Sequence, residues 1–393
     1  MTACIAGIRV VGDPRARRNT REDAWHGAKM VASKREWLFF CTAMMNKDSI
    51  SDPAGATSLA IGDIAIGGRA FLAPMSGITD IGMRRVAMRF GASLVVSEMV
   101  ASDDLAAGDE EARTRAEGEG VTPHMVQLAG CDPRWMAEGA RVAEAAGAQI
   151  IDINMGCPAK RVTGGWSGSA LMRDLDHAVT LIEATVAAVS VPVTLKMRLG
   201  WDHDSLNAPE LARRAAQAGA RMITVHGRTR QQFYKGQADW RAVAAVRAAI
   251  PGVPLVVNGD IATEDDARAA LASSGADAVM VGRAALGQPW RVGAIARALG
   301  GGAVGAPPHD QRLAGAVEHY ETLLSTYGQR MGVRHARKHL AGYAEDAIAG
   351  PAPAVDAAEA VRLRARIVVS EDPAEVILIL RKLYGHADAS LAA

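Results

Sequence analysis

The sequence predicts an α/β fold, a (β/α)8 TIM barrel followed by a small C-terminal helical domain. Between residues 71 and 299, short and almost continuously apolar runs alternate with longer stretches of helical period. Strands that are apolar throughout are buried on both faces, as in a parallel sheet covered by helices. Eight such units favour a closed barrel, and an open doubly wound sheet is the alternative.

The elements are assigned in chain order. The predicted strands are Phe71–Pro74, Ser93–Ser97, His124–Leu128, Ile150–Asn154, Pro192–Lys196, Met222–Val225, Pro254–Val257 and Ala278–Val281. The predicted helices are Ile81–Phe90, Pro133–Ala146, Leu175–Val189, Ala208–Ala218, Trp240–Ala249, Thr263–Ala272 and Pro289–Leu299. Each strand is followed by polar residues or glycine. Because the carboxyl ends of barrel strands meet at one rim, these residues are expected to lie together, where barrel enzymes carry their chemistry.

The chain is divided into three parts. Residues 1–66 show no clear period and are expected to be a disordered extension, or the product of a start codon assigned too far upstream. The barrel is assigned to 67–305 and the helical domain to 306–393, after a glycine- and proline-rich linker. The helices expected in the last part are His309–Tyr327, Gly332–Ile348, Asp356–Val369 and Pro373–Tyr384.

Composition narrows the function classes. Lysine and arginine number 44 against 43 acidic residues, so the net charge is +1 and a globally basic nucleic-acid binder is excluded, although a local basic patch is not. No apolar run approaches the ~20 residues of a membrane span, so no membrane association is expected. The cysteines form no CxxC pair and the histidines show no HExxH spacing, so no metal is predicted and a cytoplasmic location is expected.

The most informative segment follows the fourth strand. Asn154 is followed by Gly156, Cys157 and Pro158, and then by a glycine-rich loop that reaches Met172. A thiol held at a barrel rim is suited to act as an acid, a base or a nucleophile. A buried structural cysteine is the alternative, and the position in a rim loop disfavours it.

Other strand ends offer sites for an anionic ligand. Lys196 ends an apolar strand, so its ammonium needs either an anionic ligand, such as a reduced flavin ring, or a strand-end acid, Glu98 or Asp152. Asn258–Asp260 and Gly282–Arg283 follow the last two strands, where barrels often bind phosphate, although ordinary turns share this composition. The notable basic segment of the C-terminal part contains Arg330, Arg334, Arg337 and Lys338 at helical spacing. Such a stripe can bind a phosphate backbone, or it can be a solvated helix face.

Through these residues and their neighbours, the sequence resembles the tRNA-dihydrouridine synthase family, and most of all its B-type bacterial branch. The similarity covers about residues 67 to 345, in the segments Ala73–Asp80, Asn154–Pro158, Gly164–Met172, Leu195–Arg198, His226–Gln231, Asn258–Asp260, Gly282–Arg283 and Ala336–His339. It implies an FMN-bearing barrel that reduces the C5–C6 double bond of a D-loop uridine in tRNA to 5,6-dihydrouridine. It also implies NADPH or NADH as reductant, and similarity to the B-type branch suggests tRNA position 17. A monomer is expected.

The resemblance also assigns a role to individual residues. Cys157 is the general acid, and Asn154 and Arg198 face the target uracil. Pro74, Met75 and Ser76 border the flavin, Gln127 and Lys196 contact its isoalloxazine ring, and His226, Asn258, Gly259, Asp260, Gly282 and Arg283 hold the remainder and its phosphate. Arg334, Arg337 and Lys338 contact the tRNA.

The implied chemistry is coherent. A hydride added at uracil C6 requires a proton at C5 from the opposite face, and a thiol is ordinarily protonated at neutral pH. The base must leave its stack, which favours a flexible, non-helical part of the tRNA. Two other functions stay open: an FMN barrel that reduces a free pyrimidine or a small enone, and an RNA-binding protein whose barrel no longer reacts. One departure is that Gly342-Tyr343 stands where the family usually has a Trp-Tyr pair.

Overall fold

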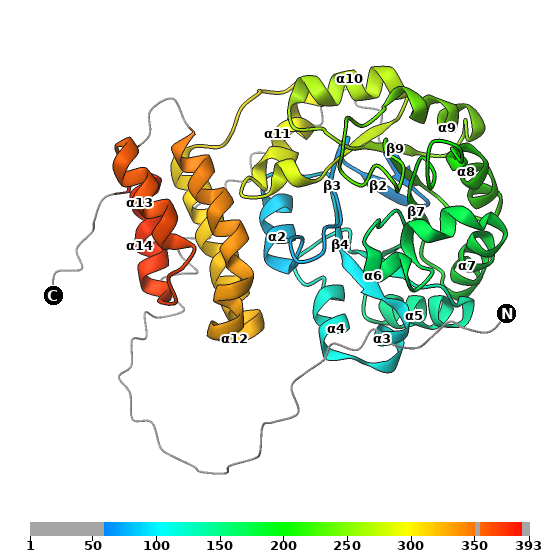
Figure 1. Cartoon of the computed structure of the whole chain (residues 1–393), viewed down its shortest axis with the longest axis horizontal. Helices are drawn as coiled ribbons and strands as arrows, with labels where there is room; N and C mark the ends of the chain where they lie inside the picture. The colour runs from blue at the N-terminus through cyan, green and yellow to red at the C-terminus, as the bar shows by residue number, and fades with distance from the viewer. Residues whose placement is uncertain (1–58, 350–353, 387–393) are drawn as a thin grey trace, which may run out of the picture. The chain divides into compact units, whose positions relative to one another are not determined.

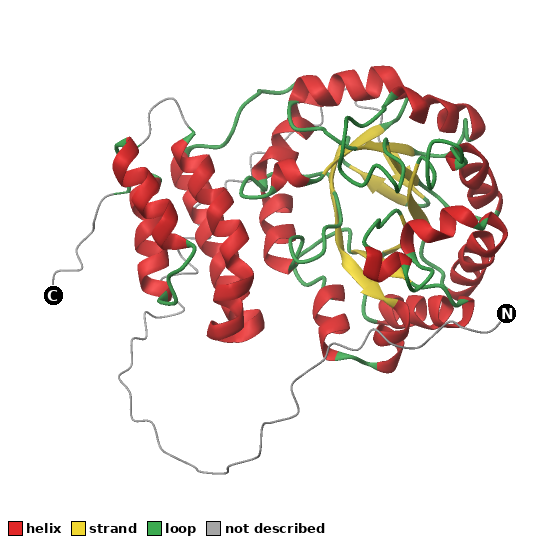
Figure 2. Ribbon diagram, in the orientation of Figure 1, coloured by secondary structure: helices red, strands yellow, loops and turns green. Residues whose placement is uncertain are grey.

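The computed structural model describes residues 59–349 and 354–386, and its central feature is a closed barrel of parallel strands (Figures 1 and 2). Adjacent strands follow the order β10-β3-β4-β5-β6-β7-β8-β9, and the sheet closes on itself. The predicted barrel is therefore confirmed, and the open doubly wound sheet is excluded. The strands are β3 (Ala70–Leu72), β4 (Leu94–Ala101), β5 (Met125–Ala129), β6 (Ile150–Met155), β7 (Val193–Arg198), β8 (Ile223–His226), β9 (Leu255–Asn258) and β10 (Ala278–Val281). All eight coincide with the predicted strands to within a few residues.

Helices surround the barrel (Figure 2). Those expected from the sequence are α2 (Ile81–Arg89), α5 (Pro133–Ala145), α7 (Leu175–Ala188), α8 (Ala208–Gln217), α9 (Ala244–Ala249), α10 (Glu264–Ser274) and α11 (Trp290–Leu299). Short elements not anticipated are α3 (Ser102–Ala107), α4 (Glu110–Ala116), α6 (Lys160–Thr163) and the 3₁₀ helices η1 (Gly168–Arg173), η2 (Arg241–Val243) and η3 (Arg283–Ala285). Side-chain caps begin several helices: Asp80 accepts from the Met83 amide, and Thr263 and Asp266 form a capping box. None of the described helices is long and apolar enough to cross a membrane.

A hairpin of two short strands precedes the barrel. The antiparallel strands β1 (Leu59–Ile61) and β2 (Ile64–Ile66) bury Ile61 and Ile66. These two side chains cluster with residues near the amino ends of the barrel strands, among them Leu94 and Ile150. The hairpin therefore packs at the end opposite the functional rim. Residues 59–66, assigned above to a disordered extension, thus have regular structure, while residues 1–58 lie outside the described part of the chain.

The C-terminal helices form a second packed cluster. They are α12 (His309–Ile348), α13 (Ala357–Ile367) and α14 (Pro373–Leu383). Gly328 interrupts α12 with a left-handed φ of 71°, which separates two helical arms as expected from the predicted break between residues 327 and 332. The arms approach closely, because a Cβ on Gly332 would lie 2.6 Å from the Leu323 carbonyl oxygen. The described barrel and helices fall in one compact unit, so the domain division at 305/306 stays a prediction.

A buried Asp–His cluster joins α12 to the barrel. His319 lies 3.0 Å from the Asp80 carboxylate through Nε2 and 2.8 Å from the Tyr343 hydroxyl through Nδ1. His339 packs beside it, with Nε2 3.4 Å from Asp80. Burial alone would raise the pKa of Asp80, but the two histidines hold it well below its usual range. The cluster brings together groups 239 positions apart, which is why the sequence did not indicate it.

The Gly342 departure has a steric explanation. A Cβ on Gly342 would lie 2.8 Å from the Gly287 Cα and 3.0 Å from its nitrogen, so a larger side chain does not fit without moving the backbone. An indole is nevertheless present nearby, because Trp290 stacks on Tyr343 with ring centroids 5.9 Å apart. The close approach of α12 to the barrel thus depends on glycine at this position.

Candidate active site

A chain of buried polar side chains crosses β5, β6 and β7 inside the barrel. Gln127 donates to Asp152 at 2.6 Å and accepts from the Asn154 amide at 2.7 Å. Thr194 donates to the other Asp152 oxygen at 2.6 Å. Residues paired in register on parallel strands share a face, and Gln127, Asp152 and Thr194 are so paired. The Gln127 side chain is fully buried and, in this arrangement, positions Asn154 rather than facing an open site.

Asn154 in turn holds the loop that carries Cys157. Its Oδ1 accepts from the Gly156 amide at 3.1 Å and from the Cys157 amide at 2.9 Å. On the far side of the loop, Ser169 donates to the Cys157 carbonyl oxygen at 2.9 Å through its hydroxyl. The Cys157 thiol is free and partly exposed. Asn154, expected to face a uracil, therefore uses its amide to fix the cysteine, and this orienting role was missed at the sequence level.

Arg198 is buried and held by backbone carbonyls. Its Nε donates to Gly156 at 2.8 Å, and Nη1 donates to Thr229 at 2.8 Å and to Phe233 at 2.9 Å. Burial lowers its pKa to about 10, so it stays charged at neutral pH. Arg198 thus ties the Cys157 loop to the loop after β8.

Lys196 faces the barrel interior next to Asn154, its register partner on β6. Burial and the charge of Arg198 lower the pKa of Lys196 to about 8, against an opposing effect of Asp152. Burial also raises the pKa of Asp152 to about 6. Among the described residues no carboxylate lies within 4.0 Å of the ammonium, and Glu98 instead accepts from the Gly77 amide. The simple salt bridge considered as an alternative for Lys196 is therefore not formed.

His226 has an unsatisfied ring nitrogen that faces a cationic environment. Its buried Nδ1 has no hydrogen-bond partner within the described residues. Burial, followed by the charges of Lys196, Arg198, Arg228 and Arg283, lowers its pKa well below the usual range, so the imidazole is neutral. A neutral imidazole with a free nitrogen among four cations fits an anionic ligand that brings its own hydrogen-bonding groups.

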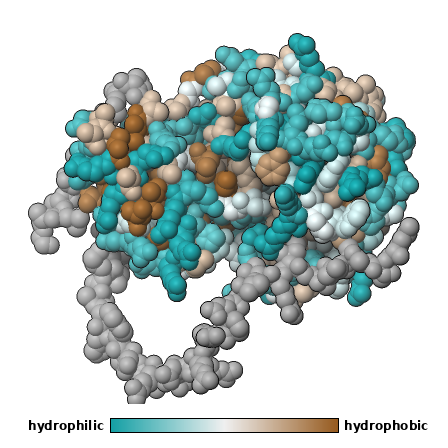
Figure 3. All heavy atoms as spheres, viewed as in Figure 1, coloured by the Kyte–Doolittle hydropathy of each residue, from teal (hydrophilic) through white to brown (hydrophobic). Residues whose placement is uncertain are grey.

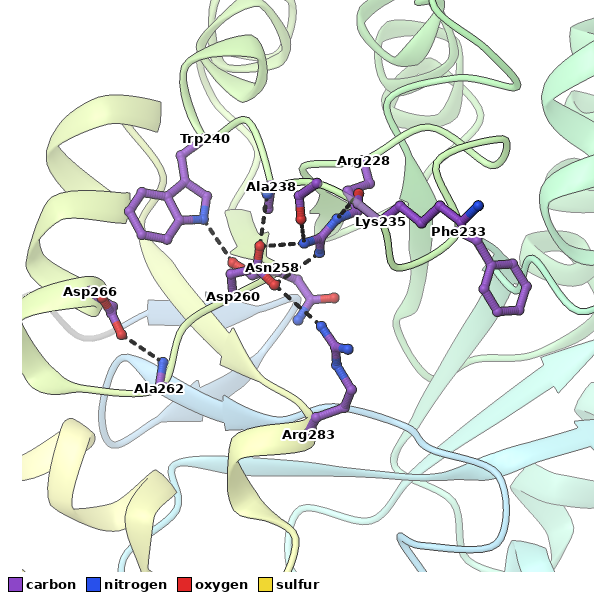
Figure 4. A network of polar contacts seen from close by, with 12 residues as sticks. Arg228, Phe233, Lys235, Ala238, Trp240, Asn258, Asp260, Ala262, Asp266 and Arg283 are labelled. Atoms are coloured by element: carbon purple, nitrogen blue, oxygen red, sulfur yellow. Dashed lines mark hydrogen bonds and ion pairs between the residues drawn. The ribbon is translucent and has the colours of Figure 1, made fainter.

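Asp260 organises two of these cations (Figure 4). The Arg228 guanidinium binds both of its oxygens, at 2.9 Å through Nη1, and Arg283 approaches at 3.3 Å. The Ala238 amide also donates to it at 2.8 Å. Since its oxygens are so occupied and a carboxylate repels phosphate, Asp260 positions the arginines rather than contacting a phosphate itself. Arg228 was not assigned a role from the sequence, although its place two residues after a strand-end histidine was visible.

The remaining predicted cofactor residues lie along the same rim. The Asn258 side-chain amide donates to the Met280 carbonyl oxygen at 2.7 Å, and this bond fixes the Asn258 side chain beside β10. Gly259 adopts a φ of +114°, and a Cβ there would lie 2.8 Å from Ala238 and 3.2 Å from the His226 ring. The turn after β3 spans Pro74, Met75 and Ser76 and is closed by bonds between Met75 and Thr79. Gly282 lies next to this turn, because its missing Cβ would point at Met75 and Ala73 at about 3.8 Å.

The basic stripe on α12 is divided by the fold. Arg330, Arg334 and Arg337 line a hollow of about 630 Å³ together with Gln329, Val333 and Glu371. Arg337 lies 3.8 Å from Glu371. Lys338 points elsewhere, since its Nζ lies 2.9 Å from the position a Cβ on Gly77 would take, beside Glu98. Figure 3 shows hydrophilic side chains over most of the viewed face and apolar ones gathered over the C-terminal helices.

Comparisons with known proteins identify the family of the chain. The family model described as "Dihydrouridine synthase (Dus)" matches residues 71–367. The chain belongs to the dihydrouridine synthase family. A probable tRNA-dihydrouridine synthase of Rhizobium leguminosarum bv. phaseoli is 53% identical over 83% of this chain and 97% of its own length. One of Rhodobacter capsulatus is 53% identical over 81% and 95%, and tRNA-dihydrouridine synthase B of Xanthomonas axonopodis pv. citri is 47% identical over 73% and 86%.

The rim of this dihydrouridine synthase chain fits a flavin. The buried orphan nitrogen of His226 and the ammonium of Lys196 suit a ring system that carries polar edges and becomes anionic when reduced. Arg283, which is 60% exposed next to the glycine turn at Gly259, suits its phosphate. Arg228 is buried and donates to Asp260 and to the Lys235 and Gly236 carbonyl oxygens, so it supports Arg283 through Asp260. The donors and the charges therefore match the two ends of one cofactor.

Proposed function

We propose that this chain reduces the C5–C6 double bond of a D-loop uridine in tRNA, at position 17, with FMN as cofactor and NADPH or NADH as reductant. The observation that carries the proposal is the arrangement around Cys157. Asn154 fixes the loop of a free, partly exposed thiol. Lys196, which is cationic, and His226, whose ring nitrogen has no partner within the described residues, lie at the same rim. A base that enters the rim would meet the proton donor on the Cys157 loop, and Lys196 and His226 would hold the cofactor that reduces it.

In this proposal each rim residue has a physical task. Lys196 supplies positive charge against the ring, and Arg283 holds the phosphate, while the buried Arg228 fixes Asp260 and through it Arg283. Arg198 keeps the Cys157 loop closed against the loop after β8. Met75 borders the ring from the turn after β3. Asn154 and Gln127 act indirectly, because they set the position of the thiol.

The proton at C5 comes from Cys157. FMN held by these residues would supply the hydride chemistry at C6. The Cys157 S–H bond then breaks and a C5–H bond forms, which leaves a thiolate that takes a proton from water before the next turnover. Lys196 and Arg198 both lie within electrostatic reach of Cys157.

The RNA contacts extend beyond the rim. Arg330, Arg334 and Arg337 surround a hollow wide enough for a phosphate backbone, and their charges are exposed. Lys338 lies at the rim beside Gly77 and is placed there, next to the target nucleotide, rather than in the hollow. We expect a monomeric enzyme that acts in the cytoplasm, where tRNA is processed.

The test uses the full chain loaded with FMN and an unmodified tRNA transcript. With NADPH we expect one dihydrouridine per tRNA, mapped by mass spectrometry to position 17, and NADH compared in parallel identifies the preferred reductant. Free uridine is the control substrate and should not be turned over. Rapid reduction of free uridine without product in tRNA would indicate the small-molecule reductase instead. A protein that fails to retain FMN would exclude both the tRNA reductase and the small-molecule reductase.

A further inference from the structure

Two tryptophans and two arginines from three rim loops form one continuous stack. The Arg173 guanidinium lies 5.6 Å from the Trp166 ring centroid and 4.9 Å from that of Trp201. Arg230 also lies over Trp201, 4.7 Å from its ring centroid. Flat cations and aromatic rings thus alternate in the order Trp166, Arg173, Trp201, Arg230, and the stack ends in an exposed indole.

Trp166 is held in a costly conformation at the outer end of this stack. Its side chain is 55% exposed, and its φ of 60° lies in the left-handed region that residues other than glycine rarely adopt. Burial does not explain a large aromatic side chain in this place, since more than half of it faces solvent. Strained residues of this kind concentrate at binding sites, where the surrounding structure enforces them.

The outer half of the stack lies in the loop that carries Cys157. Trp166 and Arg173 both lie in the segment that begins at Cys157, and Gly168 packs directly against the Cys157 carbonyl and Cβ. Arg230 is anchored to this segment through Thr163, at 3.4 Å. A nucleotide next to one seated over Cys157 therefore passes close to the stack.

A hollow beside Trp166 gives the stack room for a partner. It measures about 460 Å³ and is lined by Trp166, Arg173, Asp174, Leu175 and Asp176, which is enough for a nucleoside. The two carboxylates disfavour a phosphate there and can accept from the amino groups of a base. Asp174 caps α7 and is held by the His177 amide, and the exposed Asp176 pairs with Arg214 at 2.8 Å.

We propose that Trp166 binds an unpaired nucleobase that neighbours the target uridine, by stacking it on the exposed end of the Trp166–Arg173–Trp201–Arg230 ladder. The proposal rests on the proposed function for the identity of the RNA. A base is favoured over other ligands because every nucleobase presents a flat π face of the required kind, and because the ladder supplies cations without a phosphate-sized basic cradle. The role is binding and positioning, without a chemical step.

The experiment compares four full-length, FMN-loaded variants with the wild type. Trp166→Ala and Trp166→Gly remove the ring, and glycine also suits the left-handed backbone, so misfolding is controlled. Trp166→Phe keeps an aromatic face. Trp135→Ala is the matched control, because Trp135 is likewise covered by an arginine, Arg134 at 4.7 Å, but lies on α5 and is not part of the Trp166–Arg173–Trp201–Arg230 ladder.

We expect Trp166→Ala and Trp166→Gly to weaken the Kd for unmodified tRNA roughly 5- to 100-fold, as loss of one base stack does, while Trp166→Phe stays within about threefold. The salt dependence of binding should not change, since no charge is removed. Equal affinity of wild type, Trp166→Ala and Trp166→Gly overturns the inference, as does an equal loss in Trp135→Ala.

A second measurement separates this inference from the proposed function. NADPH consumption without RNA and the visible spectrum of bound FMN should be identical in all variants. If the wild type binds tRNA through Trp166 but makes no dihydrouridine, the proposed reaction fails and the base-stacking site stands. If dihydrouridine forms at the wild-type rate and affinity in Trp166→Gly, the reaction stands and the stacking site fails.

Discussion

The barrel rim and the hollow on α12 use arginine in opposite ways. At the rim, Arg198 and Arg228 are buried, and their guanidinium groups are fixed by backbone carbonyls and by Asp260. On α12, Arg330 and Arg334 are exposed and make no ion pair within the described residues, and Arg337 has one distant partner. The difference matches the proposed roles, because a reaction needs charges held in one geometry, whereas binding of a phosphate backbone needs only charges within reach.

The largest effect on activity is expected from replacing the thiol at the barrel rim. Cys157→Ala removes the proposed proton donor, and product formation in tRNA should fall at least about 100-fold, the usual contribution of a positioned acid. FMN absorbance and tRNA affinity should stay unchanged, because Asn154 binds the loop through backbone amides that alanine retains. The rate is measured as dihydrouridine formed in a single turnover.

Ser167→Ala is the matched control for this substitution, because it removes a hydroxyl from the same loop whose bond, to Gly165, does not involve the cysteine. Its rate should equal that of the wild type. A Cys157→Ala enzyme that keeps full turnover would show that the proton comes from another group.

A smaller effect is expected from the hollow. Replacing Arg330, Arg334 and Arg337 together by alanine should weaken tRNA binding roughly tenfold near 0.15 M salt and lower the slope of log K against log salt by about two. The change in slope is smaller than that expected for the loss of three free charges, because Arg337 already lies close to Glu371. Filter binding over a salt series measures both quantities.

Lys338→Ala sharpens the comparison, since Lys338 belongs to the same stripe in sequence but lies at the rim beside Gly77. Its effect on the slope should be at most about one, and it should lower the rate of reduction more than the triple variant does. If the slope of log K against log salt is unchanged in the triple variant, the arginine stripe is a solvated helix face that does not bind RNA.

The smallest effect concerns pH. Because burial lowers the pKa of Lys196 to about 8, its ammonium is present below that pH and lost above it. FMN affinity should therefore fall as pH rises from 7 to 8.5, by roughly fourfold, which is the change in the charged fraction. Lys196→Met should bind FMN more weakly at pH 7 and show a flat profile, and a wild-type profile that is equally flat would remove Lys196 from the cofactor site. Fluorescence titration of FMN gives these affinities.

Much of the barrel could be predicted from the sequence because its signals are local. Strands such as Ala278–Val281 are apolar over their whole length and lie between Asp277 and Gly282, so their type and ends are visible along the chain. The break at Gly328 was equally local, since the helical pattern stopped there. The β1–β2 hairpin was missed because three residues per strand are too few to show a period.

For the candidate site, the sequence established which residues gather at the rim, since every barrel strand ends on the same side. It also indicated the thiol loop and the family to which the chain belongs. Only the tertiary structure decided what each polar group touches: that Asn154 holds Cys157, that Asp260 holds Arg228, and that Lys338 leaves the arginine stripe. The reason is that strand identity follows from neighbouring residues, whereas a hydrogen bond or an ion pair forms across strands and helices distant in the chain, where side-chain direction and packing select the partner.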